Sequence, residues 1–416
     1  NVNETPVMNP QAFALYENTA IGINLYDALA ADPDILGPFA FSNIAFSVVP
    51  GGSADDFFNI DAAGNVTISD YIDLETDGSL VVLNVRVQDD GGLLDEDPFS
   101  ITVNLVEPEI FDGLASIPSS SLNVTVEWDT VQNVLYDVYT STDNPGGGMT
   151  WAKILDAQVA VSTSMVITAS SSEDRRYFTV VDRGDPVDTN AMWGVIRNSY
   201  MPIDTNTTQR GFTLAAAPIG SDRAFNGDFG LMLMEGLAGH NGGTMDGLGD
   251  EVLIYNPTNQ MWDVLYLDTT NQWRESDTTL STRIVPPGRG YFLLNNSATT
   301  KETAFIGPVG NKLASSVEVL SGKWNMITLS EGAVLTLEQA FIQLNGSSLT
   351  GSFDETQADL IVKINSDGSF RRLLYAGDNT WRSLDPQDFG EVATDTVNPG
   401  ESFYFFRYGA DMTINF

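Results

Sequence analysis

"FFNIDAAGNVTISDYIDLET" spans residues 57–76 and decides how the N-terminal part of the chain is interpreted. Two short runs of alternating apolar and polar residues flank a turn that ends at Gly64, a pattern that predicts a β-hairpin. An Asp-x-Glu sequence follows it at Asp73 and Glu75. Similar alternating runs occur along the chain, for example at 80–88, 100–106, 134–142 and 175–181. The sequence therefore predicts an all-β protein of tandem antiparallel β-sandwich domains.

The composition restricts the function classes. The chain has 416 residues, with 19 Lys+Arg against 56 Asp+Glu and a net charge of −37. Residues 1–108 hold eighteen of the acids and one base, Arg86. This charge argues against binding to nucleic acid or to an anionic membrane, because both attract basic surfaces. It favours an extracellular surface or divalent cations, which would offset the repulsion between carboxylates.

The absence of cysteine and of long apolar runs excludes further classes. With no cysteine, the chain has no disulfide framework, no thiolate nucleophile and no cysteine zinc site. No apolar run reaches the roughly 18 residues that a membrane helix needs. Helical patterns are scarce, and the best candidate is residues 336–344. We expect an extracellular or cell-surface protein, bacterial in origin, with no membrane span in this segment.

An internal duplication defines the C-terminal half of the chain. Residues 250–266 align without gaps on residues 359–375, which places Asp250 on Asp359. Further landmarks recur in the same order, namely Trp273-Arg274 with Trp381-Arg382 and 285–295 with 397–407. The duplication predicts two β modules, at 205–310 and 311–416.

Residues 109–204 resemble a fibronectin-III or immunoglobulin-like sandwich. The resemblance is carried by Trp128, the strand at 136–139, the glycine-rich turn at 144–149 and the strand at 176–180. It implies that the strand-borne tryptophan packs against a later tyrosine.

Residues 1–106 resemble a cadherin repeat, and the domain is expected to span 1–108. Five elements match the family in order and spacing: Glu17-Asn18, Asp32-Pro33-Asp34, the hairpin with Phe58-Asn59-Ile60-Asp61 and Gly64-Asn65-Val66, Asp73-Leu74-Glu75, and Asp89. The resemblance implies a seven-strand Greek-key sandwich with Ca²⁺ bound between consecutive repeats. The opening residues, NVNETP, resemble the linker that precedes such a repeat. Asn1 is then expected to be an internal point of a longer precursor.

The resemblance also implies two groups of calcium ligands. At one pole, the Asn3 side chain and the Thr5 carbonyl would join the carboxylates of Asp32, Asp34 and Asp89. At the opposite pole, Glu17, Asp73 and Glu75 would face the next domain. Calcium binds six to eight oxygens and mixes carboxylates with carbonyls, which fits these residue types. The alternative is that these carboxylates are solvated or accept hydrogen bonds from loop amides.

The linker at each pole departs from the family pattern. Asn1 stands where the family has a carboxylate, and Glu4 is longer than the usual aspartate. After the repeat, residues 104–111 keep Glu107 and Glu109 but lack the family's Asp-x-Asn-Asp-Asn motif.

Three other features have two interpretations each. His240, in the glycine-rich segment 236–251, belongs to a surface loop or to an active site, and no nucleophile or orienting acid indicates a triad. Residues 89–98 form a solvated hairpin tip or a second calcium loop. Trp273 and Trp381 are core residues or platforms for sugar rings.

Two functions follow from these observations. The first is a non-enzymatic structural protein, a subunit of a fibre, filament or surface layer built from calcium-stiffened β domains. Its copies would self-assemble through edge strands or domain ends, and the alternating C-terminal stretch 410–416 would complete its own sheet or a neighbour's. The second is an adhesin or carbohydrate-binding protein that presents a glycan site on the duplicated modules.

Overall fold

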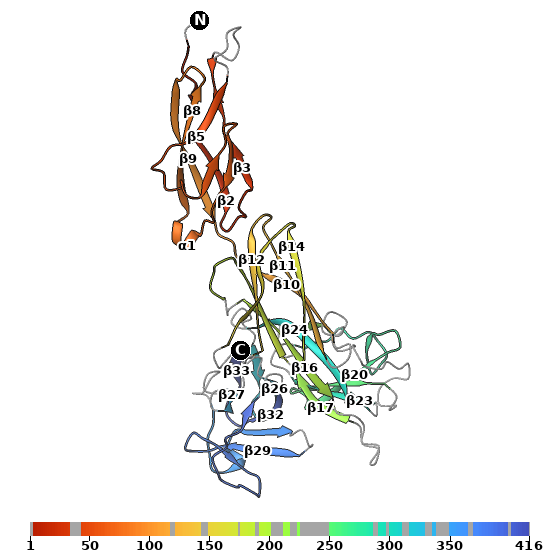
Figure 1. Ribbon diagram of the computed structural model, residues 1–416. Helices are drawn as coiled ribbons and strands as arrows, with labels where there is room; N and C mark the ends of the chain where they lie inside the picture. Colours follow the sequence, from red (N-terminus) through yellow and green to blue (C-terminus); the bar gives the residue numbers. More distant parts are fainter. Residues whose placement is uncertain are drawn as a thin grey trace.

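The structure is a computed structural model of the chain (Figure 1). It describes residues 3–33, 43–116, 121–142, 149–173, 175–187, 191–200, 211–216, 223–224, 249–285, 290–296, 299–309, 316–328, 335–337, 349–364, 369–397 and 401–415. The described elements are almost all strands, as the sequence predicts. The exceptions are the short helix α1 (Leu74–Asp77) and the 3₁₀ turn η3 (Glu355–Gln357). Most of the expected helix at 336–344 lies outside the described residues.

The N-terminal part folds as a β-sandwich of two sheets, which we call the N-terminal sandwich. One sheet has the order β2 (Gln11–Tyr16), β9 (Leu94–Asn104), β8 (Leu80–Asp89), β5 (Ile44–Val48). The other has the order β3 (Asn24–Asp27), β7 (Asn65–Ile68), β6 (Phe58–Ile60). The short strands β1 (Val7–Met8) and β4 (Ala30–Ala31) pair with each other. All pairings are antiparallel except that of β2 with β9. The seven strands of the two larger sheets confirm the predicted sandwich.

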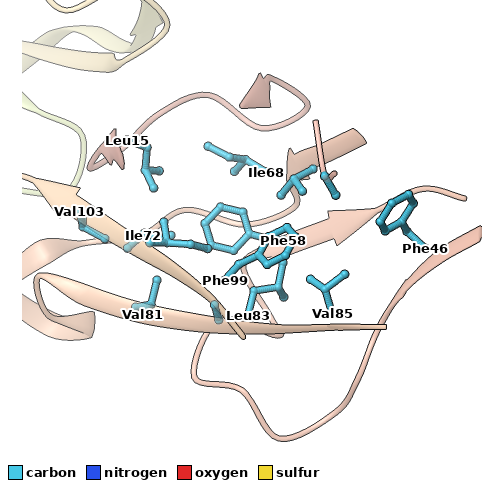
Figure 2. Close-up of a cluster of buried hydrophobic side chains, with 14 of the residues drawn as sticks. Leu15, Phe46, Phe58, Ile68, Ile72, Val81, Leu83, Val85, Phe99 and Val103 are labelled. Atoms are coloured by element: carbon cyan, nitrogen blue, oxygen red, sulfur yellow. The ribbon is translucent and has the colours of Figure 1, made fainter. Parts of the chain in front are cut away.

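The core of this sandwich lies between the two sheets (Figure 2). Along β8, the apolar residues Val81, Leu83, Val85 and Val87 are at most 1% exposed, and the residues between them are partly exposed. This period of two is the property of a strand with one buried face. Phe58 of β6 packs against them from the other sheet, and Phe99 of β9 lies beside Leu83 in the same sheet.

The predicted hairpin at 57–76 forms as β6 and β7, with Phe58 opposite Ile68 and Ile60 opposite Val66. The Asp61 carboxylate holds the turn, because it accepts hydrogen bonds from the Ala63 and Asn65 amides at 2.9 Å. Gly64 is required at its position. Its φ is +95°, and a Cβ there would lie 3.0 Å from the Phe46 ring.

The next part of the chain forms a second sandwich, the central sandwich. One sheet has the order β10 (Ile110–Ser116), β11 (Leu122–Asp129), β14 (Ser164–Ser171). The other has the order β13 (Ala152–Val159), β12 (Leu135–Ser141), β15 (Arg175–Asp182), β16 (Met192–Tyr200), β24 (Lys301–Val309). Trp128 of β11 is fully buried in its core with Tyr136 and Phe178. The strand β24 comes from beyond the predicted boundary at 204, so residues 301–309 complete a sheet that begins before that boundary.

The predicted modules at 205–310 and 311–416 each contain a five-stranded sheet, and the two sheets have the same strand order. The first sheet runs β17 (Gly211–Ala216), β23 (Gly290–Asn295), β19 (Glu251–Asn256), β20 (Met261–Leu267), β21 (Trp273–Glu275). The second runs β26 (Lys323–Thr328), β32 (Ser402–Arg407), β28 (Leu360–Ile364), β29 (Phe370–Tyr375), β30 (Trp381–Ser383).

Short pairs of strands accompany the module sheets. They are β18 (Arg223–Ala224) with β22 (Ile284–Val285), β27 (Leu335–Thr336) with β31 (Thr396–Val397), and β25 (Ser316–Val319) with β33 (Met412–Asn415). The C-terminal strand β33 therefore pairs within its own module, with Met412 and Ile414 buried. Phe416 lies outside the described residues.

The duplicated aspartates Asp250 and Asp359 are buried structural groups, each 0% exposed. Each accepts a hydrogen bond from the backbone amide that follows the matched strand, Asn296 at 2.8 Å and Tyr408 at 2.7 Å. Each also forms a buried ion pair, Asp250 with Lys301 and Asp359 with Arg407. These pairs explain why aspartate recurs at the same place in both modules.

The modules contact each other through an aromatic interface. Tyr255, Trp262 and Phe292 of the first module meet Tyr404 of the second, with ring centroids 6.2 to 6.4 Å apart. Trp324 packs against Tyr404 within the second module. Because side chains alternate along a strand, Phe403 and Phe405 point into the core of their module while Tyr404 faces the other module. The Gly290 backbone also lies close to side chains of the second module, since a Cβ on Gly290 would lie 2.6 Å from the Ser402 hydroxyl.

Candidate calcium sites

The first candidate site lies at the N-terminal end of the N-terminal sandwich. Pairing of β1 with β4 sets Val7 opposite Ala31, so the segment that follows Asn3 runs beside Asp32. Asp89 ends β8, and the chain then turns into β9. The predicted ligand Asp34 and the linker residue Asn1 lie outside the described residues.

Two oxygens at this pole, one on Asn3 and one on Asp89, are buried without a hydrogen-bond donor. Asp32 and Asp89 are each 6% exposed. One oxygen of Asp89 accepts the Leu93 amide at 2.8 Å, while its Oδ2 has no hydrogen-bond partner, and the same holds for Asn3 Oδ1. A buried carboxylate oxygen with no donor is costly unless a cation reaches it. The residues therefore fit a hard cation. Thr5 is exposed, and its predicted part is its backbone carbonyl.

The second candidate site lies at the opposite pole, where Glu17, Asp73 and Glu75 come together. One carboxylate oxygen from each lies within 4.8 Å of the others. Glu17 directly follows β2, whereas Asp73 and Glu75 lie at the start of α1. The three carboxylates predicted at this pole thus lie close together in the fold, although Glu17 and Asp73 are 56 positions apart in the sequence.

Two of these carboxylates also accept hydrogen bonds from loop amides, as the alternative interpretation predicts. The fully buried Glu17 accepts Leu74 N at 3.0 Å and Val106 N at 2.6 Å. Asp73 caps α1 by accepting Glu75 N at 2.9 Å and Thr76 N at 3.3 Å. These amides orient the carboxylates, and each oxygen keeps further lone pairs for a cation.

The pKa values reflect this arrangement. Burial acts against the charged form of Asp73, but hydrogen bonds from Thr76 and Glu75 outweigh it and lower the pKa of Asp73. For Glu75, a backbone hydrogen bond is outweighed by burial and by the Asp73 and Glu17 carboxylates, which together raise its pKa. The surroundings thus favour the charged form of Asp73 and disfavour that of Glu75.

The central sandwich adds acidic groups that the sequence analysis did not assign to the site. Asp182 ends β15 and is 1% exposed, and its Oδ2 accepts the Asn18 side-chain amide at 2.8 Å. Burial raises the pKa of Asp182 to about 8, and nearby Asp185 and Glu17 add to the shift. The available signal was the sequence VVDRGDP at 180–186, in which two aspartates follow a buried strand. These two aspartates do not stand at a spacing that belongs to a family motif, so the sequence alone does not link them to the site.

The junction between the two sandwiches is built from hydrogen-bonded backbone. Ala20 N donates to Asn133 O at 2.7 Å, and Leu135 N donates to Asn18 O at 3.0 Å. The Arg183 guanidinium lies 3.7 Å from the centre of the Tyr71 ring. In Figure 1 the N-terminal sandwich and the central sandwich accordingly lie end to end, with α1 beside the junction.

The remaining predicted features fall as follows. Trp273 and Trp381 are 0% and 1% exposed, which confirms the core interpretation. Residues 89–98 form the tip and second strand of the β8–β9 hairpin, so the hairpin interpretation is confirmed. His240 lies outside the described residues. Within the described part of the chain, no helix is long and apolar enough to cross a membrane.

Comparison with known proteins gives structural neighbours only. No protein-family model and no curated protein matches the chain. Among solved structures, domains 1–3 of mouse clustered protocadherin gamma C3 are 20% identical, with 25% of this chain and 33% of that chain covered and a TM-score of 0.21. The third cadherin domain of human protocadherin 7 is 19% identical, with 25% and 90% covered and a TM-score of 0.21.

A two-domain cadherin fragment also matches. Domains 1–2 of human protocadherin-24 are 11% identical, with 40% of this chain and 97% of that chain covered and a TM-score of 0.21. The chain spans about one third of the first two solved structures that it matches. From its strand order and its five motif elements, the N-terminal sandwich is cadherin-like.

Proposed function

We propose that this protein is an extracellular structural protein, the subunit of a bacterial fibre, filament or surface layer. The observation that carries the proposal is that successive units are joined by ordered contacts. The two sandwiches share backbone hydrogen bonds, β24 joins the central sandwich after the first module, and the two modules meet through aromatic rings. Such junctions resist bending, which a load-bearing subunit needs. The role is mechanical and requires no catalytic centre.

In this proposal Ca²⁺ stiffens the N-terminal sandwich at its two poles. Asn3, Asp32, Asp34 and Asp89, with the Thr5 carbonyl, would hold one ion, and Glu17, Asp73 and Glu75 would contribute to another. The ion supplies positive charge to groups that otherwise repel one another. Support comes from the buried oxygens of Asn3 and Asp89 that have no hydrogen-bond partner.

Removing calcium tests this proposal. Chelation with EDTA is expected to lower the Tm of the N-terminal sandwich, because a bound ion stabilises the folded state by about 2.7 kcal/mol at a hundredfold excess over its Kd. Asp32→Asn/Asp89→Asn should lose most of this response in calorimetry. The matched control Asp27→Asn/Asp56→Asn removes two exposed carboxylates of the same sandwich and should respond like the wild type. A wild type with equal Tm values in calcium and in EDTA would reject calcium stiffening.

Self-assembly is the second part of the proposal. The described sheets end in edge strands, among them β13 and β10, whose outward-facing backbone groups could pair with another copy. Electron microscopy of the purified chain in calcium should show filaments or a lattice. Particles that stay monomeric at every concentration and in every calcium condition would contradict assembly by this chain alone.

An alternative function is glycan binding, and one observation favours it. Tyr255, Trp262, Trp324, Val362 and Tyr404 line a hollow of about 310 Å³ at the module interface. Aromatic faces bind the apolar faces of sugars. This hollow replaces Trp273 and Trp381 as the candidate site, because those two tryptophans are buried.

Glycan-array binding tests the alternative. Trp262→Ala and Trp324→Ala should abolish binding if the hollow holds a sugar, because each removes a stacking face. Phe389→Ala is the control, since Phe389 is 71% exposed and does not line the hollow. Circular dichroism must show that the variants stay folded. No binding by the wild type, or equal binding by all variants, would remove the alternative.

A further inference from the structure

The hollow at the module interface is lined by aromatic rings that stand at right angles to one another. Tyr404 of β32 is the residue that the other three rings contact. Its ring centroid lies 6.2 to 6.4 Å from those of Tyr255, Trp262 and Trp324. The planes of these three rings make angles of 83° to 90° with the Tyr404 plane. A flat ligand can stack on only one such ring, whereas perpendicular rings can surround a compact, rounded ligand.

The hollow has no charged group of its own. In the described part of the chain, its lining consists of the four aromatic residues and Val362. Lys323 precedes Trp324 in the sequence, but its ammonium group donates to the Thr258 carbonyl. The faces of tryptophan and tyrosine rings carry negative potential and attract cations. The hollow therefore offers several cation-attracting faces, and the side chains that line it supply no cation.

The polar groups of the hollow are few and neutral. Burial raises the pKa of both Tyr255 and Tyr404, so their hydroxyls stay protonated. Neither hydroxyl has a hydrogen-bond partner among the residues that the structure describes. The lining side chains include no carboxylate and no amide. A sugar ring would leave most of its hydroxyls without partners here, which is costly in a partly buried site.

The duplication shows that the module sheet does not itself require an aromatic residue at the position of Tyr255. The alignment of residues 250–266 with 359–375 places Ile364 at the matched position of the second module. The pairing of β19 with β23 and of β28 with β32 agrees with this alignment. An aliphatic side chain thus satisfies the same strand. The tyrosine is accounted for by what lies across the interface, namely the ring-lined hollow.

We propose that this hollow binds a trimethylammonium group, the compact organic cation of choline, between Tyr255, Trp262, Trp324 and Tyr404. Such a cation has no N–H donor, so it needs ring faces rather than hydrogen-bond acceptors. The phenol hydroxyls are available to the oxygen that choline carries. The chain as a whole, with 56 Asp+Glu against 19 Lys+Arg, also attracts cations. The inference goes beyond the proposed structural role, and it competes with a glycan for the same hollow.

Binding of choline chloride to the full chain tests the inference. Calorimetry should show saturable binding of one choline, and tryptophan fluorescence should change because Trp262 and Trp324 line the hollow. Dimethylbutanol, the neutral carbon isostere of choline, has the same shape without the charge. It should bind at least about tenfold more weakly, because it lacks the attraction between cation and rings. Phosphocholine carries the same group on a phosphate ester, and its affinity relative to choline distinguishes a headgroup from the free alcohol as the source.

Matched variants locate the site. Tyr255→Ile introduces the residue that the second module has at the matched position, and it should weaken choline binding about tenfold. Trp324→Leu removes another ring and should have a similar effect. Tyr408→Ile is the control, because Tyr408 is 45% exposed and does not line the hollow. Circular dichroism should show that all three variants stay folded.

Three results would overturn the inference. They are no choline binding by the wild type, equal binding of choline and dimethylbutanol, and unchanged choline binding by a folded Tyr255→Ile variant. A wild type that binds neutral sugars and no choline would overturn it in favour of the glycan alternative. None of these results bears on calcium binding or on filament formation, so the proposed structural function stands or fails by its own tests.

Discussion

Trp381→Ala is expected to lower the free energy of unfolding of the second module by about 3–5 kcal/mol, the usual cost of removing a large core aromatic. Trp381 is 1% exposed and packs against Tyr375 with ring centroids 5.2 Å apart. It belongs to the cluster that also holds Phe403 and Phe405. The substitution therefore leaves a cavity in the middle of the module.

Urea unfolding followed by tryptophan fluorescence and circular dichroism measures this loss. Trp273→Ala should have a similar effect in the first module, because Trp273 is 0% exposed at the matched position. Phe353→Ala is the control, since Phe353 is 70% exposed. If both tryptophan variants keep wild-type stability and lose glycan binding instead, then these residues are binding platforms and the core interpretation is wrong.

Asp359→Ala is expected to destabilise the second module by a comparable amount, about 3–5 kcal/mol, because it leaves Arg407 as an unpaired buried cation. The two side chains are 0% and 5% exposed. Asp359 also accepts the Thr350 and Tyr408 amides at 2.8 and 2.7 Å, and both donors would lose their partner. The lost ion pair and the lost amide hydrogen bonds act on the same module.

The same unfolding measurement tests this prediction. Asp250→Ala should weaken the first module in the same way, because Asp250 pairs with Lys301 at the start of β24. Glu96→Gln breaks the Arg86–Glu96 pair, whose side chains are 39% and 40% exposed, and should change stability by less than about 1 kcal/mol. Asp359→Ala with unchanged stability would show that the buried pair contributes nothing to the fold.

Features with local signatures were predictable from the sequence. The hairpin at 57–76 was predictable because its alternation and turn residues are adjacent in sequence, and β6 and β7 pair as expected. The matched strand orders of the two modules follow from landmarks such as Asp250 and Asp359, because a duplicated packing position keeps its residue type. The meeting of Glu17 with Asp73 has no local signature and was expected only from the resemblance to a cadherin repeat.

Contacts without local signatures were not predictable. Asp182 lies 109 residues after Asp73, and an aspartate at a strand end has no spacing that would link it to another domain. The pairing of β16 with β24 joins strands separated by the whole first module. The contact between Trp262 and Tyr404 depends on how the sheets of the two modules pack against each other. The alternation of residues within one strand does not specify that packing.

The pairing of β16 with β24 also determines how the chain would transmit a pulling force. Met192 lies opposite Val309 at one end of this ladder, and Tyr200 lies opposite Lys301 at the other. Tension from the two termini enters at Met192 and leaves at Val309, so the ladder would be peeled one hydrogen bond at a time. The first module connects to the far end of the ladder, so tension along the backbone does not pass through it until all nine residue pairs have separated. The chain of the first module would therefore lengthen the protein under tension only after strands β16 and β24 have separated.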